Sequence, residues 1–193
     1  MACETLITAG LTFDCGSAPA RGYEPQILLI NRADIDFSGV TYSTTHKNTL
    51  TALGLLSGKK GYIIETKGAA PFTGSASEAE VGTYATTVNK TIVIPVLKND
   101  RDTAEKLEDG LLNGEFVAIR ELKDKGPGNN SAFEVVGLEN GARLSAYAAD
   151  PYGDTFAGGL YTLQETGASR TKFYLGESYT AGKALWNSIA DLD

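Results

Sequence analysis

Short apolar segments separated by turn-forming residues are the feature that most restricts what this chain can fold into. Residues 27–30 are a typical apolar run, only as long as a strand, and most such runs end at glycine, asparagine or aspartate. This spacing favours strands joined by turns over a helical bundle. The 22 glycines and the many threonine and tyrosine residues agree with it.

Ten segments have the pattern of a strand, and Asn140-Gly141 indicates a hairpin turn between two of them. Residues 81–97 exceed the usual strand of about five or six residues, so this segment either bends or serves more than one sheet. We expect a turn-rich connection over residues 51–60 and a long exposed loop over residues 68–80. The strand-like segments are residues 5–13, 25–30, 39–44, 61–67, 81–97, 115–122, 132–138, 142–148, 159–164 and 171–175.

Residues 100–113 predict the main helix, because Ala104, Leu107 and Leu111 form one apolar stripe. Residues 99–102, Asn-Asp-Arg-Asp, supply capping residues at its start, Asp102 and Glu105 have the spacing of a capping box, and Asn113-Gly114 ends it.

Residues 180–192 predict a short C-terminal helix, with Thr180 as its cap and Leu185, Ile189 and Leu192 on one side. Trp186 in this helix packs either on its own sheet or on a neighbouring molecule.

Together these elements predict a mainly β (α+β) fold, an antiparallel β-sandwich or barrel with one flanking helix and a short C-terminal helix. The 193 residues suit a single domain over residues 1–193, with an extended N-terminal segment and the exposed loop near residues 68–80.

The net charge of −7 and the pI near 4.8 argue against sequence-independent binding to DNA or RNA phosphates. Two interpretations stay open: solubility alone, or a surface that DNA passes without sticking. No apolar stretch approaches the roughly 18 residues of a membrane span, and the N-terminus lacks a signal-like core, so we expect synthesis in the cytoplasm and no membrane partner.

Cys3 and Cys15 match no zinc motif, and one histidine is present to help them. In a reducing cytoplasm they are expected as free thiols, whereas a particle outside the cell would permit a late disulfide.

We find no residue set for catalysis, cofactor binding or metal binding, and expect the chain not to be an enzyme. His46 is the sole histidine available as a base, and nucleophile-elbow and phosphate-loop patterns are missing. Four acidic pairs, at positions 34/36, 78/80, 100/102 and 191/193, read as solvated charges. A glycosidase-type pair of carboxylates brought together in space stays open as an alternative.

The aromatic residues crowd toward the second half of the chain, where a stacking platform is one interpretation and ordinary core packing the commoner one. They are Tyr62, Tyr84, Tyr147, Tyr152, Phe156, Tyr161, Phe173, Tyr174 and Tyr179.

Several segments resemble, in order along the chain, virion proteins from phages of Bacteroides and related bacteria. The first is residues 1–15, MACETLITAGLTFDC, followed by a strand over residues 25–31 and Asp34-Ile35. The later segments are residues 83–87 leading to 92–96, residues 107–114 and 116–119, residues 133–144, Gly153-Asp154, and residues 159–163.

This resemblance implies a tail-tube-like protein, a β-sandwich flanked by a helix. Such proteins assemble as rings, typically hexameric, that stack into a tube conducting DNA. The implied partners are copies of the chain, other virion proteins, and DNA that passes in the lumen without specific binding. The implied location is the virion, assembled in the host cytoplasm. A head decoration protein or another tail or ring protein would share the pattern.

Two rival functions come from other classes: a carbohydrate- or surface-binding β module that uses exposed aromatic residues, and a hydrolase with spatially paired carboxylates.

Overall fold

The computed structural model describes residues 20–68, 70–83, 85–98, 100–149, 159–169 and 172–191. The expected strand over residues 5–13 and both cysteines, Cys3 and Cys15, lie outside these residues.

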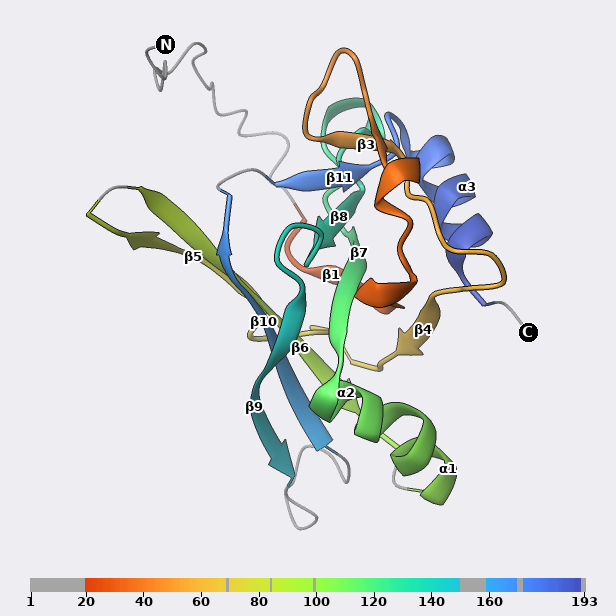
Figure 1. Ribbon diagram of the computed structural model, residues 1–193, viewed down its shortest axis with the longest axis vertical. Helices are drawn as coiled ribbons and strands as arrows, with labels where there is room; N and C mark the ends of the chain where they lie inside the picture. Colours follow the sequence, from red (N-terminus) through yellow and green to blue (C-terminus); the bar gives the residue numbers. More distant parts are fainter. Residues whose placement is uncertain are drawn as a thin grey trace.

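Most of the described chain is β-structure, accompanied by one main helix and a C-terminal helix (Figure 1). The strands are β1 (Tyr23–Asn31), β2 (Thr41–Tyr42), β3 (Thr49–Ala52), β4 (Tyr62–Glu65), β5 (Ala76–Val81), β6 (Thr86–Val96), β7 (Glu115–Leu122), β8 (Phe133–Val136), β9 (Ala142–Ala149), β10 (Gly159–Ala168) and β11 (Phe173–Leu175). The helical segments are α1 (Arg101–Thr103), a π-helical turn (Ala104–Glu108), α2 (Asp109–Asn113) and α3 (Tyr179–Ile189). The mainly β architecture with two helical regions is thus confirmed.

All eleven strands belong to one sheet in the order β2-β3-β11-β8-β7-β9-β10-β6-β5, with β1 paired to β7 and β4 paired to β1. Its pairs are antiparallel except for β3 with β11. In Figure 1 the strands β5, β6, β9 and β10 extend to one side of β7, whereas β3, β8, β11 and α3 lie toward the other end of the molecule.

The central strands are buried on both faces, because the sheet has a hydrophobic cluster on each side. In β1, Leu28 and Ile30 belong to one cluster, whereas Ile27 and Leu29 belong to the other. This explains why residues 27–30 form a continuous apolar run, since strands covered on both faces have no polar side to alternate with.

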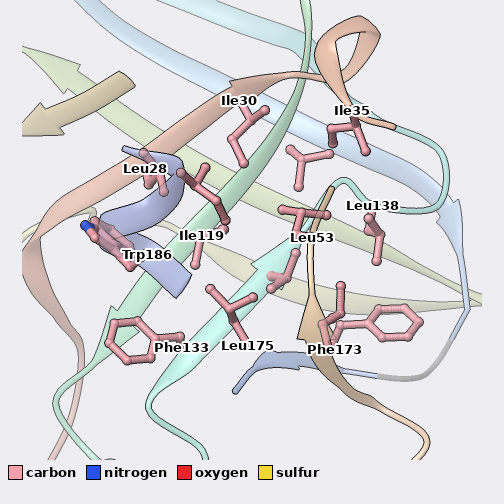
Figure 2. Close-up of a cluster of buried hydrophobic side chains, with 14 of the residues drawn as sticks. Leu28, Ile30, Ile35, Leu53, Ile119, Phe133, Leu138, Phe173, Leu175 and Trp186 are labelled. Carbon is pink, nitrogen blue, oxygen red and sulfur yellow. The ribbon is translucent and has the colours of Figure 1, made fainter. Parts of the chain in front are cut away.

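The first cluster lies between the central strands and α3 (Figure 2). Trp186 of α3 is 2% exposed and packs on Phe133 of β8, with ring centroids 5.8 Å apart. Trp186 therefore packs on its own sheet, which settles the two alternatives left open by the sequence.

The second cluster lies between the central strands and the sheet region formed by β6 and β10, with the main helix at its edge. Its members on these elements include Ile92 and Ile94 of β6, Tyr161 and Leu163 of β10, and Leu111 of α2. β6 and β10 each contribute alternate residues to this cluster, so one face of these two strands packs against the core and the other face points away from it.

The main helix spans residues 101–113, close to the predicted 100–113, and its cap lies among residues 99–102, which were expected to supply it. The Asp100 carboxylate accepts a hydrogen bond from the Thr103 N–H at 2.9 Å, so Asp100 is the N-cap. The expected capping box of Asp102 and Glu105 is wrong, because Asp102 already lies inside the helix and pairs with Lys106 at 3.1 Å.

The C-terminal helix α3 is also present, and its cap differs as well. Ser178, in an extended conformation, accepts from the Ala181 N–H at 3.3 Å, whereas Thr180 lies inside the first turn. Leu192 lies outside the described residues.

Two strands occupy segments expected to be loops or connections. β3 begins before residues 51–60 and extends into them, and β5 forms the second half of residues 68–80. All six residues of β5 are exposed, so this strand has no apolar alternation to reveal it. The long segment 81–97 divides at residues 82–85, where the Gly82 N–H donates to the Ala85 carbonyl, and β6 then pairs with both β5 and β10.

Candidate assembly surface

The sheet ends on an exposed strand, β5, which pairs with β6 on one side only. The six residues of β5 pair with residues 86–91 of β6, and the opposite edge has no strand partner among the described residues. An edge of this kind presents unpaired backbone N–H and C=O groups to a further strand.

A second open edge belongs to β9. β7 pairs with β9 only at Ala142 and Arg143, whereas β10 follows β9 on its other side as far as Ala149. Residues 145–149 are exposed and have no strand beside them on the β7 side among the described residues, although α2, which directly precedes β7, lies close to β9. The antiparallel group β9-β10-β6-β5 therefore has an open edge at each end.

The face of this four-strand group that points away from the core is polar along β5 and the adjoining half of β6, and it carries Val93, Pro95 and Leu160 farther along. The cross-strand pairs place Glu78 beside Asn89, Thr91 beside Gln164, and Thr162 beside Ala146 on that face. Glu78 and Glu80 supply its carboxylates on β5. Arg143 is its one cation within these four described strands, and its guanidinium is bonded to Glu115 at 2.8 Å.

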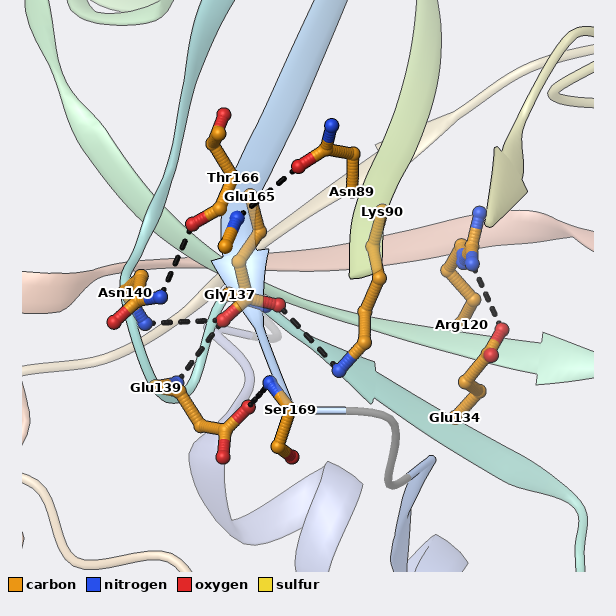
Figure 3. A network of polar contacts seen from close by, with 11 residues as sticks. Asn89, Lys90, Arg120, Glu134, Gly137, Glu139, Asn140, Glu165, Thr166 and Ser169 are labelled. Atoms are coloured by element: carbon orange, nitrogen blue, oxygen red, sulfur yellow. Dashed lines mark hydrogen bonds and ion pairs between the residues drawn. The ribbon is translucent and has the colours of Figure 1, made fainter. Parts of the chain in front are cut away.

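The buried carboxylate of Glu165 holds the segment of chain between β8 and β9. Glu165 of β10 is 1% exposed and accepts hydrogen bonds from the backbone N–H groups of Gly137, Glu139 and Asn140 at 2.9–3.1 Å (Figure 3). The Glu165 carboxylate also forms an ion pair with Lys90 of β6, which is 3.7 Å away and buried as well. These contacts hold an excursion of the chain over residues 137–141.

The hairpin expected at Asn140-Gly141 is wrong, although a turn does form there. β8 and β9 do not pair with each other; both lie along the same side of β7, β8 beside residues 118–121 and β9 beside residues 115–116. The turn itself is real, since Gly141 has φ +73° and its N–H donates to the Gly137 carbonyl. The Asn-Gly pair therefore lies in a loop that links β8 to β9 along the same side of β7. It does not reverse the chain between two strands that pair with each other.

A second buried ion pair joins β7 to β8. Arg120 donates to Glu134 at 2.8 Å, and its guanidinium lies 4.2 Å from the ring centre of Tyr23. The Nε and Nη1 atoms of Arg120 have no hydrogen-bond partner within the described part of the chain. Burial raises the pKa of the Tyr23 phenol, against the opposing charge of Arg120.

His46 lies in an exposed turn, where its backbone N–H donates to the Ser43 hydroxyl. The Ser43 hydroxyl donates to Glu177 at 2.5 Å while accepting from the backbone N–H groups of Thr45 and His46. These bonds hold the turn in place.

The acidic pairs lie in ordinary local contacts. Asp34 ends one 3₁₀ turn and Asp36 caps the next, and hydrogen bonding by Asn31, followed by Lys59, lowers the pKa of Asp34. Asp191 pairs with Lys60, whereas Asp193 lies beyond the described residues. No group of three or more potential metal ligands occurs in the described ranges.

The exposed tyrosines among the described residues lie on separate strands and do not form one platform. Tyr161 and Phe173 are buried, while the exposed Tyr42, Tyr62 and Tyr147 lie on β2, β4 and β9, which are not neighbours in the sheet. Tyr84, Tyr152 and Phe156 fall outside the described residues.

An apolar hollow of about 480 Å³ opens between β4 and the main helix. Tyr62, Ile63, Leu107 and Leu111 contribute to its walls, and Glu105 and Lys106 are its charged residues. Among the described residues, no helix has the length and apolar character to cross a membrane.

The sequence did not indicate Glu165, Lys90 or the open edges as important. A usable signal existed for Glu165, because it follows Tyr161 and Leu163 at a spacing of two and therefore continues the buried face. Comparison with known proteins gives no further guide: no family model, no curated protein and no solved structure matches the chain.

Proposed function

We propose that this chain is a structural protein of a bacteriophage virion, a tail tube subunit that assembles with its own copies into stacked rings. The single observation that carries the proposal is the sheet group β9-β10-β6-β5, which among the described residues has no strand partner at either outer edge and bears Glu78 and Glu80 but no unpaired cation on its outward face. Strands from each subunit close a barrel around a lumen, and closure removes the open edges.

The outward face of the group suits the wall of a channel for DNA. Threonine, asparagine and glutamine side chains lie on it together with Glu78 and Glu80, alongside the uncharged Val93, Pro95 and Leu160. Within these described strands, Lys90 points to the core and Arg143 is held by Glu115, so the face offers no free cation cluster for phosphates. The net charge of −7 adds repulsion. The resemblance to tail-tube-like proteins supports the same function.

Electron microscopy and sedimentation velocity of the purified full chain test this function. At high protein concentration we expect rings with a central opening and stacks of them, and sedimentation well above that of a 20.4 kDa monomer. A chain that remains monomeric at every concentration and ionic strength, without rings or tubes in micrographs, contradicts the proposal.

A measurement with DNA tests the channel part separately. Because the outward face repels phosphates, double-stranded DNA added to the assembled protein should show no binding in a filter or mobility assay at moderate salt. Tight binding that weakens steeply with salt would contradict a DNA-conducting surface and would point to a nucleic-acid-binding protein instead.

A further inference from the structure

We propose that neighbouring copies join through an antiparallel seam, in which β5 of one subunit pairs with residues 145–149 of β9 in the next. This inference rests on the proposed function and goes further, because it names the two surfaces, their relative direction and their register.

The two edges are complementary in position within the sheet. β5 is open on the side away from β6, and β9 is open on the side away from β10. They are therefore the two outer edges of one four-strand group, and joining them head to tail repeats that group without leaving an open edge between copies.

Strand direction permits this repeat. β9, β10, β6 and β5 alternate in direction, since each pair among them is antiparallel. With four strands in each copy, β5 runs opposite to the first strand of the next copy when the copies are related by rotation about one axis. The seam is then antiparallel like the pairs within each subunit.

The offset between the edges agrees with a closed barrel. The middle of β5 lies opposite residues 88–89 of β6, whereas the open part of β9 lies across β10 from residues 93–96 of β6. That is a shift of about six residues, roughly 20 Å, over four strands that span about 19 Å. The corresponding strand tilt is roughly 45°, the upper end of the range found in barrels.

Charge also distinguishes this seam from pairing between two β5 strands. β5 carries Glu78 and Glu80 and no cation, so pairing it with itself would bring carboxylates together. β9 carries Arg143 and no carboxylate. Arg143 lies on the same face as Glu80 and just beyond the open part of β9, so its guanidinium, although bonded to Glu115, places a positive charge rather than a carboxylate near Glu80 across the seam.

Apolar side chains on the opposite face fix the register. Val81 is 82% exposed and Tyr147 is 49% exposed, and both lie on the core-side face of their strands. Only registers that keep like faces together extend the two-sided sheet. The register that places the middles of the two edges together puts Ala79 opposite Tyr147 and Val81 diagonal to it, which covers both exposed side chains.

Cysteine cross-linking between copies tests the seam. In a background with Cys3→Ser and Cys15→Ser, copies carrying Ala79→Cys are mixed with copies carrying Tyr147→Cys, allowed to assemble and then oxidised. We expect a covalent dimer as the main product, because paired residues on one face have the separation a disulfide requires. The matched control replaces Ala79→Cys with Glu78→Cys, whose side chain points to the other face, and should give at least tenfold less dimer.

Each outcome separates the seam from the function. Dimer from the Ala79 mixture alone supports the seam and its register. Assembly without cross-linking in either mixture, or equal cross-linking in both, overturns the seam while the structural function stands. Failure of every variant and of the unmodified chain to assemble overturns the proposed function, and the seam with it. Circular dichroism of each variant confirms that the fold is retained.

Discussion

At the scale of single residues, a buried charged side chain fixes the path of the chain between β8 and β9. Glu165 receives three backbone N–H donors and faces Lys90, so its carboxylate is matched by donors and by a cation inside the protein. A carboxylate with so many partners anchors the chain excursion at residues 137–141 to β10. The excursion separates β8 from β9 along β7, whereas residues 145–149 of β9 lack a strand partner because β9 runs past the start of β7, where α2 precedes it.

Replacing Glu165 with alanine should destabilise the fold strongly. The change leaves Lys90 buried without its carboxylate and removes the acceptor of three backbone donors, at a cost of about 3–5 kcal/mol. Urea unfolding followed by circular dichroism measures this loss. Gln164→Ala, next to it on the other face and half-buried, is the control and should cost about 1 kcal/mol or less. Similar losses for the two variants would contradict the role assigned to Glu165.

Tyr161 predicts how stability responds to alkaline pH. Burial, together with the nearby Glu108 carboxylate and Tyr147, raises the pKa of its phenol well above the ordinary value near 10. The folded state thus holds this proton more tightly than the unfolded chain, so stability is fully present below about pH 10 and falls as pH rises above it.

We expect the urea midpoint of the unmodified protein to decrease between about pH 9.5 and 11, and Tyr161→Phe to decrease less steeply. The half-exposed Tyr62 provides the control, Tyr62→Phe, which should keep the slope of the unmodified chain. An unchanged slope in Tyr161→Phe would show that this phenol does not govern the alkaline response.

At the scale of elements, periodicity located most strands and both helices. It did not identify the cap of α3 or the exposed edge strand β5. β7 and the main helix have strong apolar patterns, and their sequence-based bounds match closely. β5 has no such pattern, because its six residues are exposed and only its pairing with β6 makes it a strand. The Asn140-Gly141 turn was recognised, yet its consequence depended on Glu165, more than twenty residues away.

The cap of α3 shows how close a sequence-based assignment can be and still choose the wrong residue. Ser178 accepts from the Ala181 N–H, and Thr180 does not cap the helix. Ser178→Ala should therefore lower stability by about 1 kcal/mol, whereas Thr180→Ala should change it by a few tenths. Thermal unfolding of the two variants side by side measures the difference, and a larger loss for Thr180→Ala would place the cap where the sequence pattern had placed it.

At the scale of the whole molecule, one sheet carries two hydrophobic clusters, and its central strands contribute to both. Ile27 and Leu28 are neighbours in β1, each fully buried, but they face opposite clusters. The sequence predicted a single domain without being able to show that two clusters share its strands, because a continuous apolar run does not reveal which side chain faces which layer. If the chain is a single domain, both clusters should unfold together in one cooperative transition.

The sole tryptophan makes cooperativity measurable. Trp186 is buried in the cluster that contains Leu28, so its fluorescence reports on that cluster, whereas far-ultraviolet circular dichroism reports on the whole sheet. We expect Ile27→Ala, on the far side from Trp186, to destabilise the protein by about 2–5 kcal/mol and to shift both signals equally. Leu28→Ala is the matched control on the near side and should do the same. A fluorescence transition that stays in place while the dichroism transition of Ile27→Ala moves would mean that the two sides of the sheet unfold separately, and that β1 and β7 do not bind them into one unit.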